Sequence, residues 1–258
     1  MTLAVAFSLT YDLTTPTVER SIFIAADSRI TYPKGPPADD GAKVIVLDPI
    51  PAVLAFSGVV NLGEPSLALA AKLVRQEPSP TLERIRDLTL AAFQKFYRPG
   101  ASLSGLLGAV SPDGTSDSIW KLAPHDSREM TVHPVSDSAM IGSEKAQAAY
   151  ESTRQEHWAS LASINPGGAP PVAVGIGHRH VIMFDKTVDE MNRGGSSTIG
   201  RPIQALLVTK DRYWSFGAGK YNEQDDEWEQ IHPRDGEVRF RNREPELHQM
   251  RRKAPDLR

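Results

Sequence analysis

The sequence predicts an α+β fold in which antiparallel sheets pack between helices. Predicted strands and helices come in blocks: four strands, two helices, four strands, two helices and two strands. Such segregation favours antiparallel sheets with helices layered outside over a doubly wound parallel sheet, in which strands and helices alternate. The 258 residues can bury a large core, and a content of 40% apolar and 24% charged residues is typical of globular proteins.

The first block of strands consists of apolar runs separated by turn residues. Ile22 to Ala26 form an uninterrupted apolar run, which is typical of a strand buried on both faces. Asp, Pro and Thr residues between the first two runs favour a long hairpin loop, and "DPIP" joins the last two. The strands predicted here are 3–9, 21–27, 43–47 and 52–57.

Helical spacing of apolar residues predicts the first helix pair. Pro65 is typical of the first turn of a helix, which we expect to run to about Gln76. Ser79 and Pro80 open a second helix. Its apolar residues recur on one face, at Leu82, Ile85, Leu88, Ala92, Phe93 and Phe96.

The second half repeats the pattern of strands, helices and strands. A helix over about 172–193 ends at Gly194 and Gly195, a typical C-terminal cap. From about residue 221 the chain becomes strongly charged, so we predict one domain over 1–220 and a polar extension over 221–258. The remaining predicted elements are strands 103–110, 116–122, 129–135, 138–142, 203–209 and 213–219, and a helix over 144–161.

Composition excludes several classes of function. The formal net charge of -3 provides no bulk attraction to nucleic acid or to an anionic membrane, so neither is expected as a partner. Without Cys there can be no disulfides, zinc–thiolate sites or Cys nucleophiles, and we expect no metal and no cofactor. The N-terminus has no basic leader and no apolar run is long enough to span a membrane, so we expect a cytoplasmic protein.

A carboxylate ends one of the apolar strands. In "SIFIAADSRIT" (21–31), Asp27 directly follows the apolar run, and Lys43 opens the strand 43–47. If the two strands are neighbours in one sheet, Lys43 can reach the end of the Asp27 strand. A buried ion pair is expensive because each ion loses its hydration. The pair is therefore either a structural salt bridge or one that serves chemistry.

The second residue offers a nucleophile. Thr2 follows the initiator Met, and a small second residue usually permits removal of that Met. The freed α-amine, with a pKa of roughly 7.7–8.0, is partly neutral and can act as base for the hydroxyl of the same residue. A nearby buried ammonium would stabilise the developing alkoxide, and a carboxylate would hold that ammonium in place.

Five stretches carry a resemblance to a known family. They are "TLAVAFSL", "AADSRIT", "KVIVLDPIPAVLAFSG", "MIGSE" and "EMNRGGSS". In their joint order and spacing they resemble a bacterial proteasome β subunit of the N-terminal-nucleophile (Ntn) hydrolases, over about residues 2–220. The resemblance implies a four-layer αββα Ntn-hydrolase sandwich with two stacked antiparallel sheets.

The resemblance also implies roles for individual residues. Thr2 would be the nucleophile, Asp27 and Lys43 the activating pair, and Ser143 an accessory hydrogen-bonding group. Glu190 stands where the family has an aspartate, and Arg193 where it has a serine. Substrate-binding roles fall on Thr31, which would align the substrate backbone, on Ser57 and Gly58, near the backbone N–H of the oxyanion hole, and on Ile30, Gly41, Ala55 and Val59, which would line an apolar specificity pocket.

The function that the resemblance implies is a self-compartmentalising threonine peptidase. It would act on peptides or unfolded proteins inside a homo-oligomeric ring or spiral, and an unfoldase is a candidate partner. The last two helices would form the face between rings, with Leu161, Phe184 and Met191 as apolar contacts. The alternatives are a catalytically degenerate ring or binding subunit and an amidohydrolase of small molecules.

Other motifs favour structural roles. His178 and His180 are two residues apart, whereas helical metal-ligand pairs prefer a spacing of four. "GGSSTIG" (194–200) lacks the Lys-Ser/Thr of a phosphate-binding loop, which favours a helix cap and loop. Ser143 also fits the N-cap of the third helix.

Overall fold

The computed structural model describes residues 2–11, 19–29, 43–47, 50–126, 128–159, 172–195, 199–201, 203–216, 220–222, 227–229 and 237–239. Within them the elements are β1 (Leu3–Tyr11), β2 (Glu19–Asp27), β3 (Val44–Val46), β4 (Ala52–Gly58), α1 (Val60–Gln76), α2 (Leu82–Phe96), β5 (Leu103–Val110), β6 (Asp117–His125), β7 (Glu129–Val135), β8 (Ser138–Gly142), α3 (Glu144–His157), α4 (Val172–Arg193), β9 (Ile203–Thr209), β10 (Arg212–Phe216), β11 (Lys220–Asn222), β12 (Glu227–Glu229) and β13 (Glu237–Arg239).

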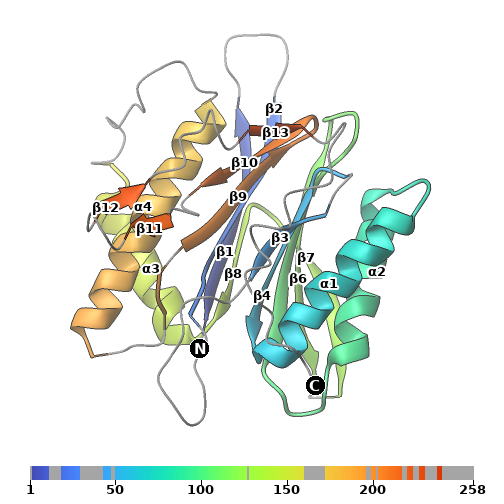
Figure 1. Cartoon of the computed structure of the whole chain (residues 1–258), viewed down its shortest axis with the longest axis horizontal. Helices are drawn as coiled ribbons and strands as arrows, with labels where there is room; N and C mark the ends of the chain where they lie inside the picture. The colour runs from blue at the N-terminus through green and yellow to red at the C-terminus, as the bar shows by residue number, and fades with distance from the viewer. Residues whose placement is uncertain are drawn as a thin grey trace.

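Two antiparallel sheets lie at the centre of the molecule (Figure 1). The six-stranded sheet has the order β13-β10-β9-β2-β1-β8, and the five-stranded sheet has the order β3-β4-β5-β6-β7. In the larger sheet Ala4 of β1 lies opposite Ala26 of β2, so the start of β1 meets the end of β2. The register therefore places Thr2 and Asp27 at the same end of the sheet.

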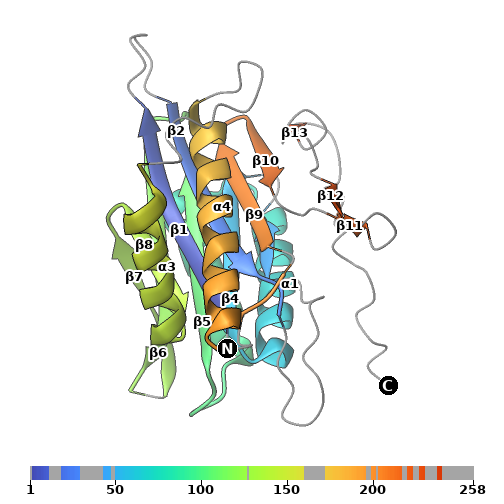
Figure 2. The ribbon, with the colours of Figure 1, turned by 90° about the vertical axis from the view of Figure 1, so that its left-hand side faces the viewer.

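Helices cover the outer face of each sheet. Helices α1 and α2 pack on the five-stranded sheet, and α3 and α4 lie side by side over the six-stranded one (Figures 1 and 2). In α2 the apolar face is buried at Ile85, Ala92 and Phe93, as its spacing predicts, and Thr81 caps its N-terminus by accepting from Arg84 N. Helix α1 begins at Val60, five residues earlier than Pro65 predicts.

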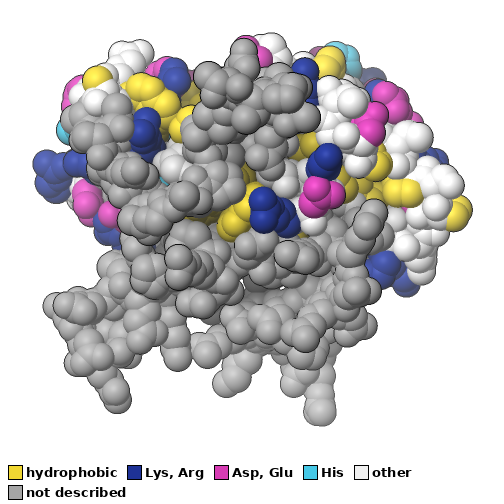
Figure 3. All heavy atoms as spheres, turned by 90° about the horizontal axis from the view of Figure 1, so that it is seen from above, with side chains coloured by type: hydrophobic (Ala, Val, Ile, Leu, Met, Phe, Trp, Pro, Cys, Tyr) yellow, Lys and Arg dark blue, Asp and Glu magenta, His cyan; other side chains and the backbone are white. Residues whose placement is uncertain are grey.

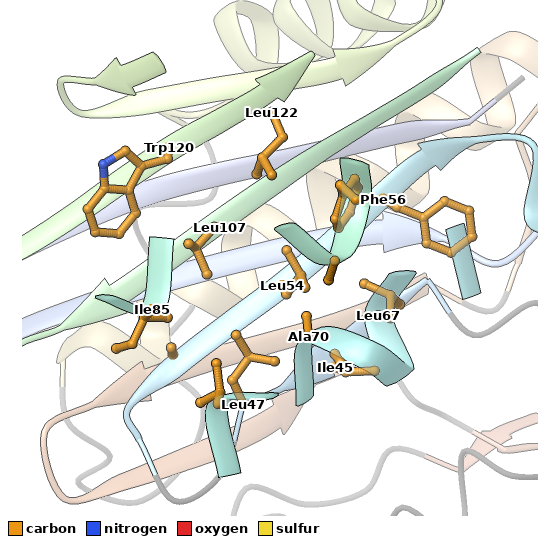
Figure 4. Packing of buried hydrophobic residues seen from close by; sticks show 14 of the residues in the cluster. Ile45, Leu47, Leu54, Phe56, Leu67, Ala70, Ile85, Leu107, Trp120 and Leu122 are labelled. Atoms are coloured by element: carbon orange, nitrogen blue, oxygen red, sulfur yellow. The ribbon is translucent and has the colours of Figure 1, made fainter. Parts of the chain in front are cut away.

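Three apolar clusters fill the spaces between these elements. One lies between α3, α4 and the six-stranded sheet, and includes Phe184 and Met191. A second lies between α1, α2 and the five-stranded sheet (Figure 4). The third lies between the two sheets and contains mostly small and β-branched side chains, among them Ala4, Ile24 and Val53. Small side chains allow the sheets to approach closely where β1, β2 and β4 face one another.

The expected fold class, a four-layer αββα Ntn-hydrolase sandwich with two stacked antiparallel sheets, is wrong as stated. The described residues form a mixed α+β fold with two large antiparallel sheets and four helices, and β11 and β12 form a further two-stranded sheet. Strand β13 also pairs with β10 and widens the larger sheet. No strand was expected beyond residue 219, yet β10 would otherwise be an edge whose free N–H and C=O groups favour pairing.

The described surface carries charges of both signs. Seen from above, Lys and Arg side chains are interspersed with Asp and Glu over the described part of that face (Figure 3). Within the described residues, no helix is long and apolar enough to cross a membrane.

Candidate functional site

Thr2 lies directly before β1 and is almost completely buried, with 3% of its surface exposed. Its carbonyl oxygen accepts a hydrogen bond from Ser143 N at 3.3 Å. Gly142, at the end of β8, has φ +122°, and a Cβ atom there would lie only 1.8 Å from Thr2 O. The end of β8 therefore holds the backbone of Thr2 from one side, and only glycine fits this close approach.

Asp27 ends β2 with a fully buried carboxylate. Its Oδ1 accepts from Leu3 N at 2.8 Å, and its Oδ2 accepts from Arg29 N at 3.1 Å. The antiparallel register of β1 and β2 explains the first bond, since it places the end of β2 beside the start of β1. Asp27 is thus tied to the backbone of the residue that follows Thr2.

Lys43 connects these two residues. Its Nζ donates to Thr2 Oγ1 at 2.9 Å and forms an ion pair with Asp27 Oδ2 at 3.2 Å. Nζ also donates to the backbone carbonyl of Arg29. Both side chains of the ion pair are 0% exposed. Removing two such charges from water costs several kcal/mol per ion, and these hydrogen bonds are the kind that offset the cost.

Burial and charge act in opposite directions on Asp27. Burial raises the pKa of the Asp27 carboxyl above its usual range, while the Lys43 ammonium and the backbone N–H groups of Leu3 and Arg29 lower it. An ammonium that also donates to a hydroxyl oxygen can stabilise negative charge as it develops on that oxygen. The arrangement can therefore activate Thr2 Oγ1 for attack on a carbonyl.

The structure brings together Thr2, Asp27 and Lys43, as the sequence predicts. The side chains of Ser143 and Glu190 are engaged elsewhere. Ser143 Oγ accepts from Ala146 N and caps α3, while the backbone N–H of Ser143 contacts Thr2.

Glu190, on α4, accepts a hydrogen bond from Thr153 of α3 at 3.0 Å. Its carboxylate belongs to a group with Glu156 and His157 whose potential ligand atoms all lie within 4.8 Å of one another. This group could hold a divalent cation, but Glu156 Oε2 also lies 3.9 Å from His157 Nε2, a contact that such side chains make without a metal. The Glu190 side chain thus faces the interface between α3 and α4.

Four of the predicted substrate-binding residues lie in the described part of the chain, and three lie outside it. Ala55 and Ser57 are buried in β4, and Gly58 ends that strand with φ +124°. Val59 is 43% exposed, and its backbone N–H donates to Ser102 O at 2.8 Å. Ile30, Thr31 and Gly41 lie outside the described residues.

Two residues at the site were missed by sequence reasoning. Gly142 lies within "MIGSE", and no pattern in that stretch indicates its positive φ or its contact with Thr2. Gln204, on β9, accepts through Oε1 from the backbone N–H groups of both Lys43 and Val44. A glutamine within the otherwise apolar run 203–208, "IQALLV", was the only available hint.

The fold is similar to those of several solved structures. A Gly-1 mutant of Anbu from Hyphomicrobium sp. strain MC1 is 14% identical, with a TM-score of 0.56 over 97% of this chain and 91% of that chain. Anbu (ancestral beta-subunit) from Yersinia bercovieri is 11% identical, with a TM-score of 0.57 over 96% of this chain and 91% of that chain. The Anbu complex from Pseudomonas aeruginosa, solved as a helical assembly, is 13% identical, with a TM-score of 0.55 over 80% and 81% of the two chains.

The chain shares the fold of these Anbu structures. At such low identity the likeness shows the fold alone. No protein-family model and no curated protein matches the chain.

The resemblance to a bacterial proteasome β subunit is corrected by these similarities. The similar structures reported above are Anbu proteins and not standard proteasome β subunits, which also removes the support for that family's sandwich as the fold class. Of the five motifs behind the resemblance, three lie in β1 to β4, one joins β8 to α3, and one lies at the end of α4. Such local motifs indicate a similar fold, but they do not distinguish between the proteins that share it.

Proposed function

We propose that the chain is a threonine-type N-terminal-nucleophile amide hydrolase, with peptides as the preferred substrate class. The observation that carries the proposal is the contact of Lys43 Nζ with Thr2 Oγ1 at 2.9 Å, made while Lys43 is paired with the buried Asp27. A salt bridge that only stabilises the fold does not need a hydroxyl at the second residue of the chain as its third member. This combination of residue types is the one that nucleophilic amide hydrolysis uses.

The proposed mechanism requires removal of Met1. The neutral α-amine of Thr2 then takes the proton of its own hydroxyl, and Oγ1 attacks the carbonyl carbon of the substrate. The tetrahedral intermediate collapses to an ester, and the departing amine takes a proton from the α-ammonium. Water, deprotonated by the α-amine, hydrolyses the ester and frees Thr2. Lys43 stabilises the charge on Oγ1 during attack, and Asp27 holds Lys43 in place.

Intact mass of the purified protein is the first test. The proposal expects the mass of the chain without Met1, and retention of Met1 would rule out an N-terminal nucleophile. Hydrolysis of a peptide panel and of small amides is then compared between the native protein, Thr2→Ser and Thr2→Val. Thr2→Ser keeps a hydroxyl and should retain activity. Thr2→Val keeps the volume of the side chain but removes the oxygen, and it should be inactive.

The second candidate function is a non-catalytic subunit of a larger assembly. Burial favours it, because Thr2 is only 3% exposed in the full chain, whereas a substrate must reach its hydroxyl. The similarity to Anbu structures fits this candidate at least as well, since it concerns the fold and not the chemistry. A protein that has lost Met1 but hydrolyses no peptide and no small amide would favour this candidate. Turnover of small amides alone would indicate an amidohydrolase.

We also propose that the chain forms a homo-oligomer. The Anbu complex from Pseudomonas aeruginosa was solved as a helical assembly, and a fold of the same kind can repeat one contact in a ring or a spiral. Of the predicted apolar contacts between rings, Phe184 and Met191 lie in the core and cannot serve, while Leu161 lies outside the described residues. Light scattering at micromolar concentration tests the proposal, and a stable monomer would contradict both the assembly and an enclosed peptidase.

A further inference from the structure

The backbone of Lys43 lies beside a short edge strand. It directly precedes β3, a strand of three residues at the edge of the five-stranded sheet. Within that sheet, Lys43 O accepts a hydrogen bond from Phe56 N at 3.1 Å. Short edge strands leave one row of backbone groups without a neighbouring strand. A contact from outside the five-stranded sheet is therefore well placed to fix where Lys43 starts toward Thr2.

Gln204 supplies that constraint from the other sheet. Its Oε1 accepts from Lys43 N at 2.9 Å and from Val44 N at 3.2 Å. An amide oxygen has two lone pairs, so one side chain can bind two successive N–H groups. The N–H groups of Lys43 and of Val44, the first residue of β3, are thus bound by a side chain of β9.

Gln204 and Asp27 hold opposite ends of the same lysine. In the six-stranded sheet Gln204 lies opposite Ala26, and Asp27 lies opposite Ile203, so the two side chains come from adjacent positions of β9 and β2. Asp27 binds the Nζ of Lys43, and Gln204 binds its backbone. The end of β2 and the start of β9, which are neighbours in the larger sheet, therefore contact both the backbone of Lys43 and its ammonium.

We infer that Gln204 is a positioning residue, which sets the reach of Lys43 to Thr2 by binding the backbone of Lys43 and Val44. This inference rests on the proposed hydrolase function. A displacement of about 1 Å at a reacting group can lower a rate about 100-fold. A shift of the start of β3 would move the ammonium relative to Thr2 Oγ1, without removing any group that reacts.

The test compares three variants of the full chain. Gln204→Met keeps the length of the side chain but cannot accept a hydrogen bond, while Gln204→Glu keeps an acceptor for both N–H groups. Gln94→Met is the matched control, because Gln94 Oε1 accepts from Met130 N in β7, the opposite edge strand of the same sheet. Each Met variant removes a side-chain oxygen that accepts from the backbone at an edge strand. Only the strand that Gln204 contacts is preceded by Lys43, which binds Thr2.

Two readouts are measured for each variant: kcat and KM with pH, and the titration of Lys43 by carbon NMR of lysine-labelled protein. Gln204→Met should lower kcat about 10- to 100-fold at similar KM and should move the Lys43 titration. Gln204→Glu should recover most of kcat with an altered pH profile. Gln94→Met should leave kcat and the Lys43 titration unchanged.

Identical behaviour of Gln204→Met and Gln94→Met in both readouts would overturn the inference. If the native protein hydrolyses nothing, the proposed function fails, and the Lys43 titration alone decides whether Gln204 positions the lysine. Should Gln204→Met not fold, Gln204→Asn takes its place. Its shorter side chain cannot reach both N–H groups, so a Lys43 titration unchanged from that of the native protein would equally overturn the inference.

Discussion

Lys43 Nζ donates a hydrogen bond to Thr2 Oγ1 at 2.9 Å, although 41 residues separate the two in the chain. The contact forms where the start of β1, the end of β2 and the residue before β3 meet. The ammonium is 0% exposed and shares its protons among a hydroxyl, a carboxylate and a backbone carbonyl. A buried charge with all its donors occupied is a rigid group, which is what positioning a nucleophile requires.

Removing one charge of the buried pair should destabilise the protein strongly. Lys43→Met leaves the Asp27 carboxylate buried without its counter-ion, and we expect a loss of about 3–5 kcal/mol in the free energy of unfolding. Urea denaturation measures this loss. The hydrolytic activity proposed above should vanish in the same variant.

Neutralising both charges should restore much of that stability. In the double variant Asp27→Asn with Lys43→Met, an amide oxygen can still accept from Leu3 N, and no uncompensated charge remains. We expect the double variant to be more stable than Lys43→Met alone and equally inactive. A double variant as unstable as the single one would mean that the ion pair itself is needed for folding.

A methyl group at Gly142 should displace Thr2. The Cβ of Gly142→Ala would lie 1.8 Å from Thr2 O, and φ is +122°, so the backbone must shift. We expect a loss of about 2–4 kcal/mol, as for a residue forced into a strained and overpacked site, together with loss of activity. Gly100→Ala is the control: its φ is also positive, but its added Cβ meets nothing within 4 Å. Equal losses in both variants would show that strain alone, and not contact with Thr2, is responsible.

His180 should make stability depend on pH. Burial among Phe7, Phe23 and Trp158, together with the smaller effect of the Arg154 charge, lowers the pKa of His180 to about 3. The unfolded chain protonates this residue near its ordinary pKa of about 6.5. Stability from the neutral folded form is therefore complete above pH 6.5, and it falls by up to about 1.4 kcal/mol per pH unit as the pH drops toward 3.

His180→Asn isolates this contribution. His180 Nδ1 lies 2.9 Å from Tyr150 Oη, and the asparagine side chain can still pair with that hydroxyl. We expect urea denaturation between pH 6.5 and 4 to show a shallower slope for this variant than for the native protein, because one titrating group is gone. The same substitution at the exposed His125 should leave the slope unchanged, and a shallower slope there would refute the assignment to His180.

A size exchange should be tolerated where α1 meets β4. A Cβ added at Gly63 would lie 2.0 Å from the ring of Phe56, which packs in the cluster shown in Figure 4. Gly63→Ala should therefore cost about 1–3 kcal/mol through overpacking. Combined with Phe56→Leu it should cost less than the sum of the two single losses, because the smaller side chain leaves room for the methyl group. Strict additivity of the three measurements would argue against this contact.

Patterns within a single element predicted that element well. The apolar positions of α2 give its buried face, and the apolar runs 3–9 and 21–27 lie in β1 and β2. Elements that depend on a distant partner were missed. Strand β13 exists because β10 offers it an open edge, and its own charged sequence contains no strand pattern.

The same limit separates the site residues. For Glu190, helical spacing gives its place on α4, but only the packing of α4 on α3 decides that its carboxylate meets Thr153. For Gln204, no local pattern shows that β9 lies beside the start of β3. Both contacts depend on how the elements pack against one another, and this packing leaves no pattern in the sequence around the residues involved.

The sequence by itself determined that a carboxylate would end a buried strand, that a lysine would precede another, and that a threonine would stand at the second position. The first two follow from apolar patterning, because a buried strand tolerates charge only at its ends, while the threonine is read directly from the sequence. Only the tertiary structure decided that Thr2, Asp27 and Lys43 touch, and that Gly142 and Gln204 hold them there. Those contacts join residues from five strands or their ends in two sheets, and it is the pairing and stacking of the sheets that brings them within hydrogen-bond distance.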